Sequence, residues 1–131
     1  MFKLTLHITP LPAGEGSGVG LLSIYLFMIR IILIGYMGAG KTTIGKALAK
    51  ALGVTFYDLD WYIETRMRRT VKQIFDAEGE DGFRRIEHNM LHEVAEFENV
   101  VISCGGGTPC FFDNIDYMNR QGKVVYLKAS P

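Results

Sequence analysis

A glycine-rich turn followed by lysine and threonine is the strongest chemical signal in the sequence. Residues 35–42 have the spacing Gly-x-x-x-x-Gly-Lys-Thr, so Lys41 and Thr42 directly follow the turn. Glycines let backbone N–H groups point at phosphate oxygens, and a helix that begins near Lys41 directs its positive end at the same anion. The lysine reaches the β- and γ-phosphates, and the threonine hydroxyl binds Mg²⁺. The pattern predicts a site for a nucleoside triphosphate.

The turn alone does not say what becomes of the phosphate. A GTPase would carry an Asn-Lys-x-Asp stretch, and the sequence has none. A motor ATPase would carry an apolar strand that ends in an acidic residue, but VVIS (100–103) and VVYL (124–127) do not. Only VTFYDLD (54–60) ends a strand in carboxylates. Transfer to an acceptor is therefore the favoured chemistry.

Two carboxylates are the first candidates for the acceptor site. Asp58 and Asp60 follow a short predicted strand, at the edge where open α/β sheets bind ligands. Strand alternation would send both side chains the same way, one toward a magnesium-bound water and one toward hydroxyls of the acceptor. Capping of the next helix is the structural alternative for Asp60.

An arginine and a triple glycine are the other candidates. Arg84 lies beside an apolar helix stripe, where its guanidinium could grip a carboxylate. A surface ion pair with Glu80 or Glu87 is the alternative reading. Gly105-Gly106-Gly107 follows the strand VVIS and would let the backbone approach a ligand closely, unless it is simply a flexible loop.

Alternating strands and helices must position these residues. Strands are predicted at IRIILI (29–34), VTFYD (54–58), NVVIS (99–103) and KVVYL (123–127). Between them we predict a helix that ends at a left-handed Gly53, two short helices over 63–69 and 71–79, a longer helix, and a small helix from Asp113 or Asn114 to Gly122. The expected apolar stripes are Ile44, Ala47, Leu48, Ala51 and Leu52 on the first helix, and Phe83, Ile86, Met90, Val94 and Phe97 on the longer one. The order predicts a parallel α/β sheet with helices on its faces.

Composition limits the possible partners. The 131 residues are 48% hydrophobic and 21% charged, as in one soluble globular domain. Basic and acidic residues number 14 each, and this zero net charge argues against nucleic acid or a membrane as partner. Cys104 and Cys110 have neither disulfide nor metal spacing. We expect a cytoplasmic monomer that acts on a small molecule.

The two ends of the sequence differ from its middle. Residues 1–27 include a Pro-, Gly- and Ser-rich stretch and the start of an apolar run, interrupted by Arg30, that suits neither a membrane span nor a signal peptide. We favour Met28 as the start of the domain, which would cover 28–131, with 1–27 as a disordered or spurious extension. The final KASP is typical of a helix start, so we expect that the domain is cut short.

Taken in order, four stretches resemble the shikimate kinases: GYMGAGKTTIGKALAKALG, FYDLDWYIE, IFDAEGEDGFRRIE and VVISCGGGTP. The resemblance covers about residues 28–131. It implies a P-loop, nucleoside-monophosphate-kinase-like parallel sheet flanked by helices, with the lid and the last strand missing. It also implies ATP-dependent phosphorylation of the 3-hydroxyl of shikimate, a step of chorismate and aromatic amino-acid synthesis. A gluconate-type kinase and a non-catalytic nucleotide-binding fragment are the alternatives.

The resemblance gives each candidate a role. Thr42 would bind Mg²⁺, with Asp58 in support, and Asp60 would hold the shikimate hydroxyls as candidate general base. Arg84 would grip the shikimate carboxylate, and the glycines at 105–107 would contact the substrate. The ATP phosphates would lie on Gly38, Ala39, Gly40, Lys41, Thr42 and Thr43, with Lys41 also catalytic. The family's lid arginine has no counterpart, which predicts a chain that binds phosphate but transfers it poorly or not at all.

Two histidines have a spacing that zinc can use. His88 and His92 are four residues apart on the predicted longer helix. Because the sequence shows no third ligand, we interpret them as part of a solvated helix face.

Overall fold

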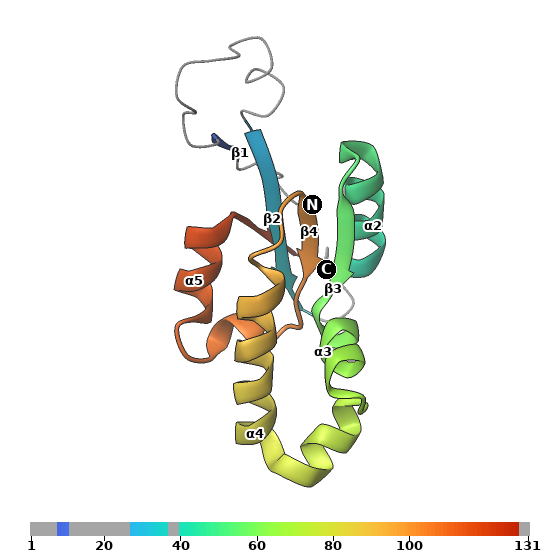
Figure 1. Ribbon diagram of the computed structural model, residues 1–131, viewed down its shortest axis with the longest axis vertical. Helices are drawn as coiled ribbons and strands as arrows, with labels where there is room; N and C mark the ends of the chain where they lie inside the picture. Colours follow the sequence, from blue (N-terminus) through green and yellow to red (C-terminus); the bar gives the residue numbers. More distant parts are fainter. Residues whose placement is uncertain (1–7, 11–26, 37–39, 129–131) are drawn as a thin grey trace.

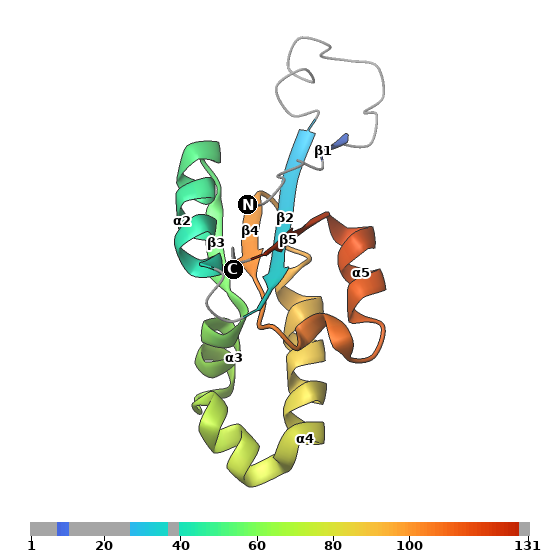
Figure 2. The same cartoon turned by 180° about the vertical axis from the view of Figure 1, so that it is seen from behind.

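The computed structural model describes residues 8–10, 27–36 and 40–128. The remaining residues of the predicted N-terminal extension, the tip of the phosphate loop and the last three residues lie outside this description. Figure 1 shows a central sheet with helices on both faces, and Figure 2 shows the same arrangement from behind. No helix in the described ranges has the length and apolar character needed to cross a membrane.

Four parallel strands form the main sheet, as the sequence predicted. They are β2 (Phe27–Gly35), β3 (Thr55–Asp58), β4 (Val100–Ser103) and β5 (Lys123–Leu127). Strand β2 pairs in parallel with β4 on one side and with β5 on the other, and β3 pairs with β4. The order is therefore β3–β4–β2–β5, and all four carboxyl ends meet at one edge.

A fifth, short strand was not foreseen. Strand β1 (Ile8–Pro10) pairs antiparallel with the beginning of β2, with Ile8 opposite Ile29. It falls inside the extension for which we expected no regular structure. Its hydrogen bonds are local to the amino end of β2, far along the strand from the edge where the site residues gather.

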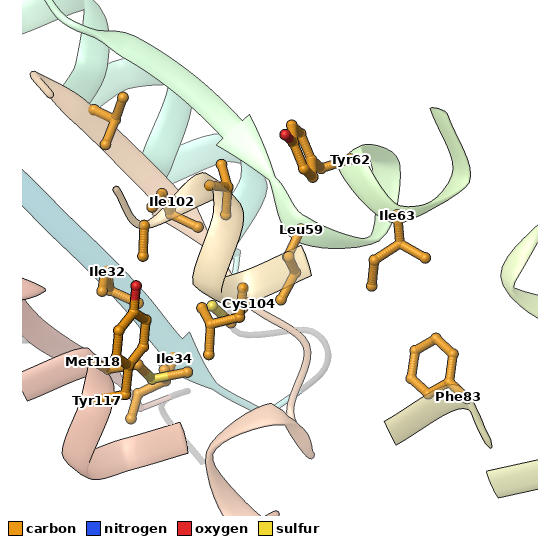
Figure 3. Packing of buried hydrophobic residues seen from close by; sticks show 14 of the residues in the cluster. Ile32, Ile34, Leu59, Tyr62, Ile63, Phe83, Ile102, Cys104, Tyr117 and Met118 are labelled. Atoms are coloured by element: carbon orange, nitrogen blue, oxygen red, sulfur yellow. The ribbon is translucent and has the colours of Figure 1, made fainter. Parts of the chain in front are cut away.

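Alternate residues of β2 enter two separate cores. Ile31 and Leu33 pack on the face covered by α2 (Lys41–Leu52). Ile32 and Ile34 pack on the other face, which α3 (Leu59–Met67), α4 (Val71–Val94) and α5 (Asn114–Gln121) cover. Figure 3 shows this second cluster around Ile32, Leu59 and Met118. Burial on both faces explains why the strand reads as a continuous apolar run.

The apolar stripe predicted for α2 was partly wrong. Ala47 and Ala51 are exposed, whereas Gly45 and Ala49 are buried against the sheet. A side chain at Gly45 would collide with the Phe56 ring, so the helix packs on β3 through its smallest residue. The predicted left-handed cap at Gly53 is confirmed, with φ 70° and its N–H directed at the last turn.

Helix α4 joins two helices that we predicted separately. It begins with a capping box, in which Thr70 and Gln73 each accept a hydrogen bond from the other's backbone N–H. Gly79 then breaks the helical geometry with φ 71° and ψ −178°, at the place where we expected one helix to end. The helix ends at Val94, so Phe97 of the predicted stripe lies beyond it. Helix α5 begins and ends as predicted, but the Asp113 side chain makes no capping hydrogen bond.

Candidate functional site

The phosphate loop connects β2 to α2 at the carboxyl edge of the sheet. Gly35 has φ 145°, and a side chain there would strike the carbonyl of Leu127 on the neighbouring strand. Gly40, with φ 79°, turns the chain into α2. Lys41 Nζ donates hydrogen bonds to the carbonyls of Gly35, at 2.6 Å, and of Tyr36, at 2.8 Å. These two hydrogen bonds hold the Lys41 ammonium against the loop that is predicted to bind phosphate.

Gly38 and Ala39, predicted to bind phosphate, lie outside the described residues. The other predicted phosphate ligands border a cavity of about 360 Å³, together with both candidate carboxylates and two of the three glycines. Its lining residues are Gly40, Lys41, Thr42, Thr43, Asp58, Asp60, Ser103, Cys104, Gly105 and Gly106. Residues from three separate segments of the chain therefore meet where the strands β2, β3 and β4 end.

The two carboxylates are not aligned by strand alternation, contrary to our prediction. Strand β3 ends at Asp58, and Asp60 lies in the first turn of α3, so strand alternation does not align the pair. Asp58, not Asp60, caps the helix, because its Oδ1 accepts a hydrogen bond from the Trp61 N–H at 3.2 Å. Both carboxylates nevertheless reach the same cavity, and Asp60 does so without a capping role.

The surroundings of Asp60 favour its protonated form. Partial burial, and then the negative charges of Asp58, Glu87 and Glu64, raise its pKa from 3.8 to about 6, although Arg84 opposes the shift. A carboxyl with a pKa near 6 is divided between its two forms close to neutral pH. Such a group is suited to accepting and returning a proton.

Arg84 is paired with Glu87, as our structural alternative foresaw, but the pair is buried instead of exposed. The guanidinium donates to Glu87 Oε1 at 3.0 Å, and Glu80 lies 4.0 Å away. Only 16% of the arginine side chain and 2% of the Glu87 side chain are exposed. Arg84 also stacks over the Phe111 ring, 4.2 Å from its centroid. Its Nε is buried and has no hydrogen-bond partner among the described residues.

The triple glycine borders Arg84 on one side and the cavity with Asp60 on the other. A side chain at Gly107 would lie 2.7 Å from Arg84 Nη2, so this glycine makes room for the guanidinium. Gly105 and Gly106 line the cavity, and a side chain at Gly105 would lie 4.0 Å from Asp60 Oδ1. Arg84 and Gly107 do not line the cavity, but Gly107 directly follows Gly106 of its wall and contacts the Arg84 guanidinium.

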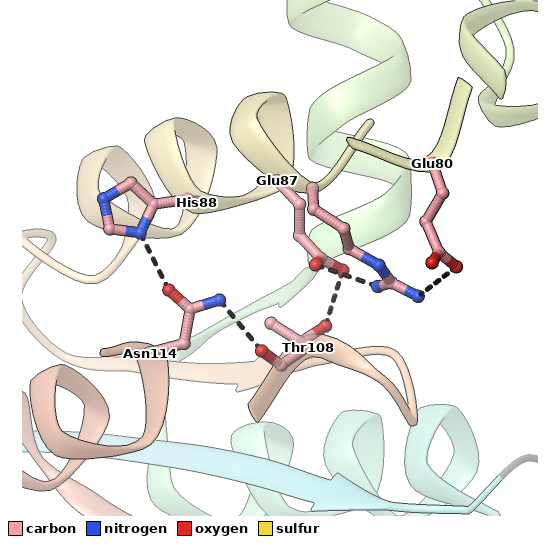
Figure 4. Close-up of polar contacts among 6 residues, drawn as sticks. Glu80, Glu87, His88, Thr108 and Asn114 are labelled. Atoms are coloured by element: carbon pink, nitrogen blue, oxygen red, sulfur yellow. Dashed lines mark hydrogen bonds and ion pairs between the residues drawn. The ribbon is translucent and has the colours of Figure 1, made fainter. Parts of the chain in front are cut away.

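A buried hydrogen-bond network behind Arg84 was missed in the sequence (Figure 4). The Thr108 hydroxyl, in the 3₁₀ turn η1 (Thr108–Cys110), donates to Glu87 Oε2 at 2.7 Å. The Asn114 amide donates to the Thr108 carbonyl at 2.8 Å, and its oxygen contacts His88 Nδ1 at 2.8 Å. The only local signal was the i, i+3 spacing of Arg84 and Glu87, because the other contacts join distant segments.

Comparison with known proteins agrees with this geometry. The family model described as shikimate kinase matches residues 37–131. Over 104 residues the chain is 65% identical to a shikimate kinase of Bacteroides thetaiotaomicron, and over 101 residues it is 48% identical to one of Legionella pneumophila. These alignments cover 79% and 77% of this chain, and 59% and 58% of the relatives.

Solved structures give the same result. The crystal structure of the Bacteroides thetaiotaomicron shikimate kinase superposes with a TM-score of 0.76 at 66% identity, covering 77% of this chain and 60% of that one. The shikimate kinase of Acinetobacter baumannii, solved in complex with shikimate, gives 0.75 at 42% identity, covering 77% and 56%. The chain thus spans about 60% of the length of the relatives that it matches. The extent of the family match shows that the chain belongs to the shikimate kinase family.

Proposed function

We propose that the protein transfers a phosphoryl group from ATP to the 3-hydroxyl of shikimate, which gives shikimate 3-phosphate for chorismate and aromatic amino-acid synthesis. Family membership supports the reaction class, and the shikimate complex of the Acinetobacter baumannii relative supports the acceptor. One observation carries the proposal for this chain. The phosphate loop, Asp60 and the glycines after β4 line a single cavity, so a donor and an acceptor can meet there.

The donor half fits ATP with Mg²⁺. Lys41 Nζ is held by two loop carbonyls, and it can exchange these for phosphate oxygens as the ligand enters. Thr42 and Asp58 line the same cavity, and one Asp58 oxygen remains beside the one that caps α3. Hydroxyl and carboxylate oxygens are ligands that Mg²⁺ prefers. When bound, ATP supplies the phosphoryl group and Mg²⁺ balances the charge on its oxygens.

The acceptor half fits a small hydroxy acid. The guanidinium of Arg84, whose plane stacks on Phe111, supports its assignment as the group that binds the acceptor's carboxylate. Asp60 orients the acceptor hydroxyl and accepts its proton, a role that a pKa of about 6 suits. Gly105 and Gly106 border the cavity beside Asp60 and offer backbone groups to the same ligand. Most of the catalysis then comes from alignment and charge placement.

We also infer that the protein works in the cytoplasm as a monomer, on small molecules and not on nucleic acid or membranes. Its zero net charge supports the last point. The two cysteines are free thiols, which suits a reducing compartment.

A coupled assay of ADP release tests the proposal. The chain is mixed with ATP, Mg²⁺ and shikimate, and compared with Asp60→Asn and with Asp76→Asn, an exposed aspartate on α4 that forms a surface ion pair with Lys72. We expect shikimate-dependent release that Asp60→Asn abolishes and Asp76→Asn preserves. Release with gluconate but not shikimate would contradict the acceptor. No release from a folded sample that binds ATP would contradict the assignment of kinase activity to this chain.

A further inference from the structure

Two histidines and an aspartate meet outside the candidate active site. His88 and His92 lie one turn apart on α4, and Asp113 directly precedes α5. One ligand atom from each of the three lies within 4.8 Å of the other two. The imidazole centroids are 4.2 Å apart, and His88 Nδ1 is 3.9 Å from Asp113 Oδ1. The fold thus brings in the third ligand that the sequence did not show.

These histidines do not form the solvated helix face that we predicted. Both are half-buried, and His92 stacks on Tyr117 with centroids 3.6 Å apart. His92 Nε2 is buried and has no hydrogen-bond partner among the described residues. A buried polar atom without a partner costs free energy, and it is rare unless a ligand completes its contacts.

We propose that His88, His92 and Asp113 bind one divalent transition-metal ion, with zinc as the best fit. Two imidazole nitrogens and one carboxylate oxygen form a donor set that zinc uses, whereas Mg²⁺ and Ca²⁺ prefer oxygen alone. Tetrahedral zinc at its usual bond lengths holds its ligand atoms about 3.3 Å apart. The three ligand atoms lie within 4.8 Å of one another, and rotation of the exposed Asp113 side chain can bring its carboxylate closer to the two imidazoles. Water would occupy the fourth position.

The surroundings leave these ligands available. His88 Nδ1 is engaged by the hydrogen bond to Asn114, which fixes the ring. His88 Nε2 is then the nitrogen that would bind the metal. Arg120 lies 3.9 Å from Asp113 Oδ2, but both side chains are more than half exposed, so this ion pair is weak.

A metal ion here would join α4 to the start of α5. Asn114, next to Asp113, binds the Thr108 carbonyl, and Thr108 holds Glu87, the partner of Arg84 (Figure 4). The ion would therefore stabilise the segment that fixes the arginine of the acceptor half. The site itself does not depend on the proposed kinase activity.

Calorimetric titration with zinc chloride tests the site. The full chain with reduced thiols is compared with His88→Gln, Asp113→Asn and the control Asp116→Asn, which changes an exposed aspartate one turn into α5. We expect one zinc ion per chain, binding at least about 10-fold weaker in His88→Gln and Asp113→Asn, and unchanged in the control. Zinc at 100-fold above its Kd should raise the Tm of the parent chain by about 10 °C.

Nuclear magnetic resonance of labelled histidines locates the ion. Zinc should shift the ring signals of both His88 and His92 in the parent chain. Absence of zinc binding would overturn the proposal. So would equal affinity in His88→Gln, Asp113→Asn and the parent, because the ion would then lie elsewhere, for example on the exposed Cys110. Circular dichroism confirms that each variant is folded before it is compared.

Discussion

The two halves of the candidate site are built differently. The phosphate half comes from one continuous turn, and its lysine donates to carbonyls of that same turn. The acceptor half joins Arg84 and Glu87 of α4 to Gly107 and Thr108 after β4. Thr108 is fully buried and Glu87 is 1% exposed, whereas Thr42 of the phosphate half is exposed. One half is a short local motif, and the other is part of the packed interior.

The two halves should therefore bind their ligands in different ways. When phosphate binds, Lys41 exchanges its hydrogen bonds to loop carbonyls for hydrogen bonds to phosphate oxygens. This exchange disturbs few packed side chains. Arg84 is already held by a buried carboxylate and an aromatic ring, so it loses little conformational freedom on binding. We therefore expect substitutions of Glu87 and Thr108, which hold Arg84, to change both the affinity for the acceptor and the stability of the fold. Asp60, where the halves meet, should govern turnover.

Asp60→Asn should have the largest effect. Loss of the general base should lower kcat by at least about 100-fold. The Tm at pH 7 should instead rise by a few degrees, because the carboxyl has its raised pKa of about 6 only in the folded chain. Between about pH 4 and 6, Asp60 is protonated in the folded chain but ionised in the unfolded chain. The negative charge of Asp60 therefore destabilises the fold fully above pH 6 and not at all well below pH 4. Turnover assays at pH 7, and thermal unfolding at pH 7 and below pH 4, check this. A lower Tm at pH 7 with unimpaired turnover would contradict it.

Arg84→Lys should mainly weaken acceptor binding. Lysine keeps the charge but loses the planar pair of donors and the stacking on Phe111. We expect the KM for shikimate to rise by roughly 10- to 100-fold, with the KM for ATP nearly unchanged. Steady-state kinetics with each substrate varied in turn give both values. An equal rise in the two constants would mean that the halves are not separate.

The pH dependence of turnover should follow Asp60. With a pKa of about 6, the ionised fraction rises roughly tenfold between pH 5 and 7, so kcat/KM should rise by the same factor and then level off. Rates measured at constant ionic strength across this range test the assignment. A flat profile would remove Asp60 as the base.

Gly107→Ala and Gly105→Ala form a matched pair. The new methyl group would lie 2.7 Å from the Arg84 guanidinium in the first variant, but only in ordinary contact with Thr108 in the second. We expect Gly107→Ala to raise the KM for shikimate by about fivefold because the guanidinium must move. Gly105→Ala should raise it less. The reverse order would show that Gly107 does not set the arginine's position.

Thr108→Val should have the smallest effect on turnover and a clear effect on stability. The variant keeps the shape but leaves one Glu87 oxygen buried without its hydroxyl donor. The free energy of unfolding should fall by roughly 1–3 kcal/mol. Urea unfolding measures this fall, with exposed Thr43→Val as a surface control. An equal loss in both variants would argue against the buried network.

Local sequence patterns predicted the phosphate half of the site and the strand and helix on either side of it. The apolar run of β2 and the Gly53 cap each depend on neighbours in sequence, and the structure has both where we expected them. The α2 stripe was wrong because the burial of Gly45 depends on Phe56, in the next strand. The alternation of Asp58 and Asp60 was wrong because helix α3 begins one residue earlier than Asp60.

The acceptor half could be predicted only in part. Arg84 and the triple glycine are visible as residue types, but the contact of Gly107 with the guanidinium joins two segments that are distant in sequence. Thr108 and Asn114 carry no chemical signal by themselves, and their roles appear only when α4 packs on η1. The third ligand beside His88 was missed for the same reason. Long-range packing, not local propensity, fixes these contacts.

Calorimetric titration of shikimate into the chain tests most directly the claim that the acceptor half is preformed. It measures binding in the absence of ATP and of turnover. We predict one site per chain that Arg84→Lys and Gly107→Ala weaken and that the exposed surface variant Asp76→Asn preserves. Absence of binding to a folded chain, or equal binding by all of these variants, would contradict it.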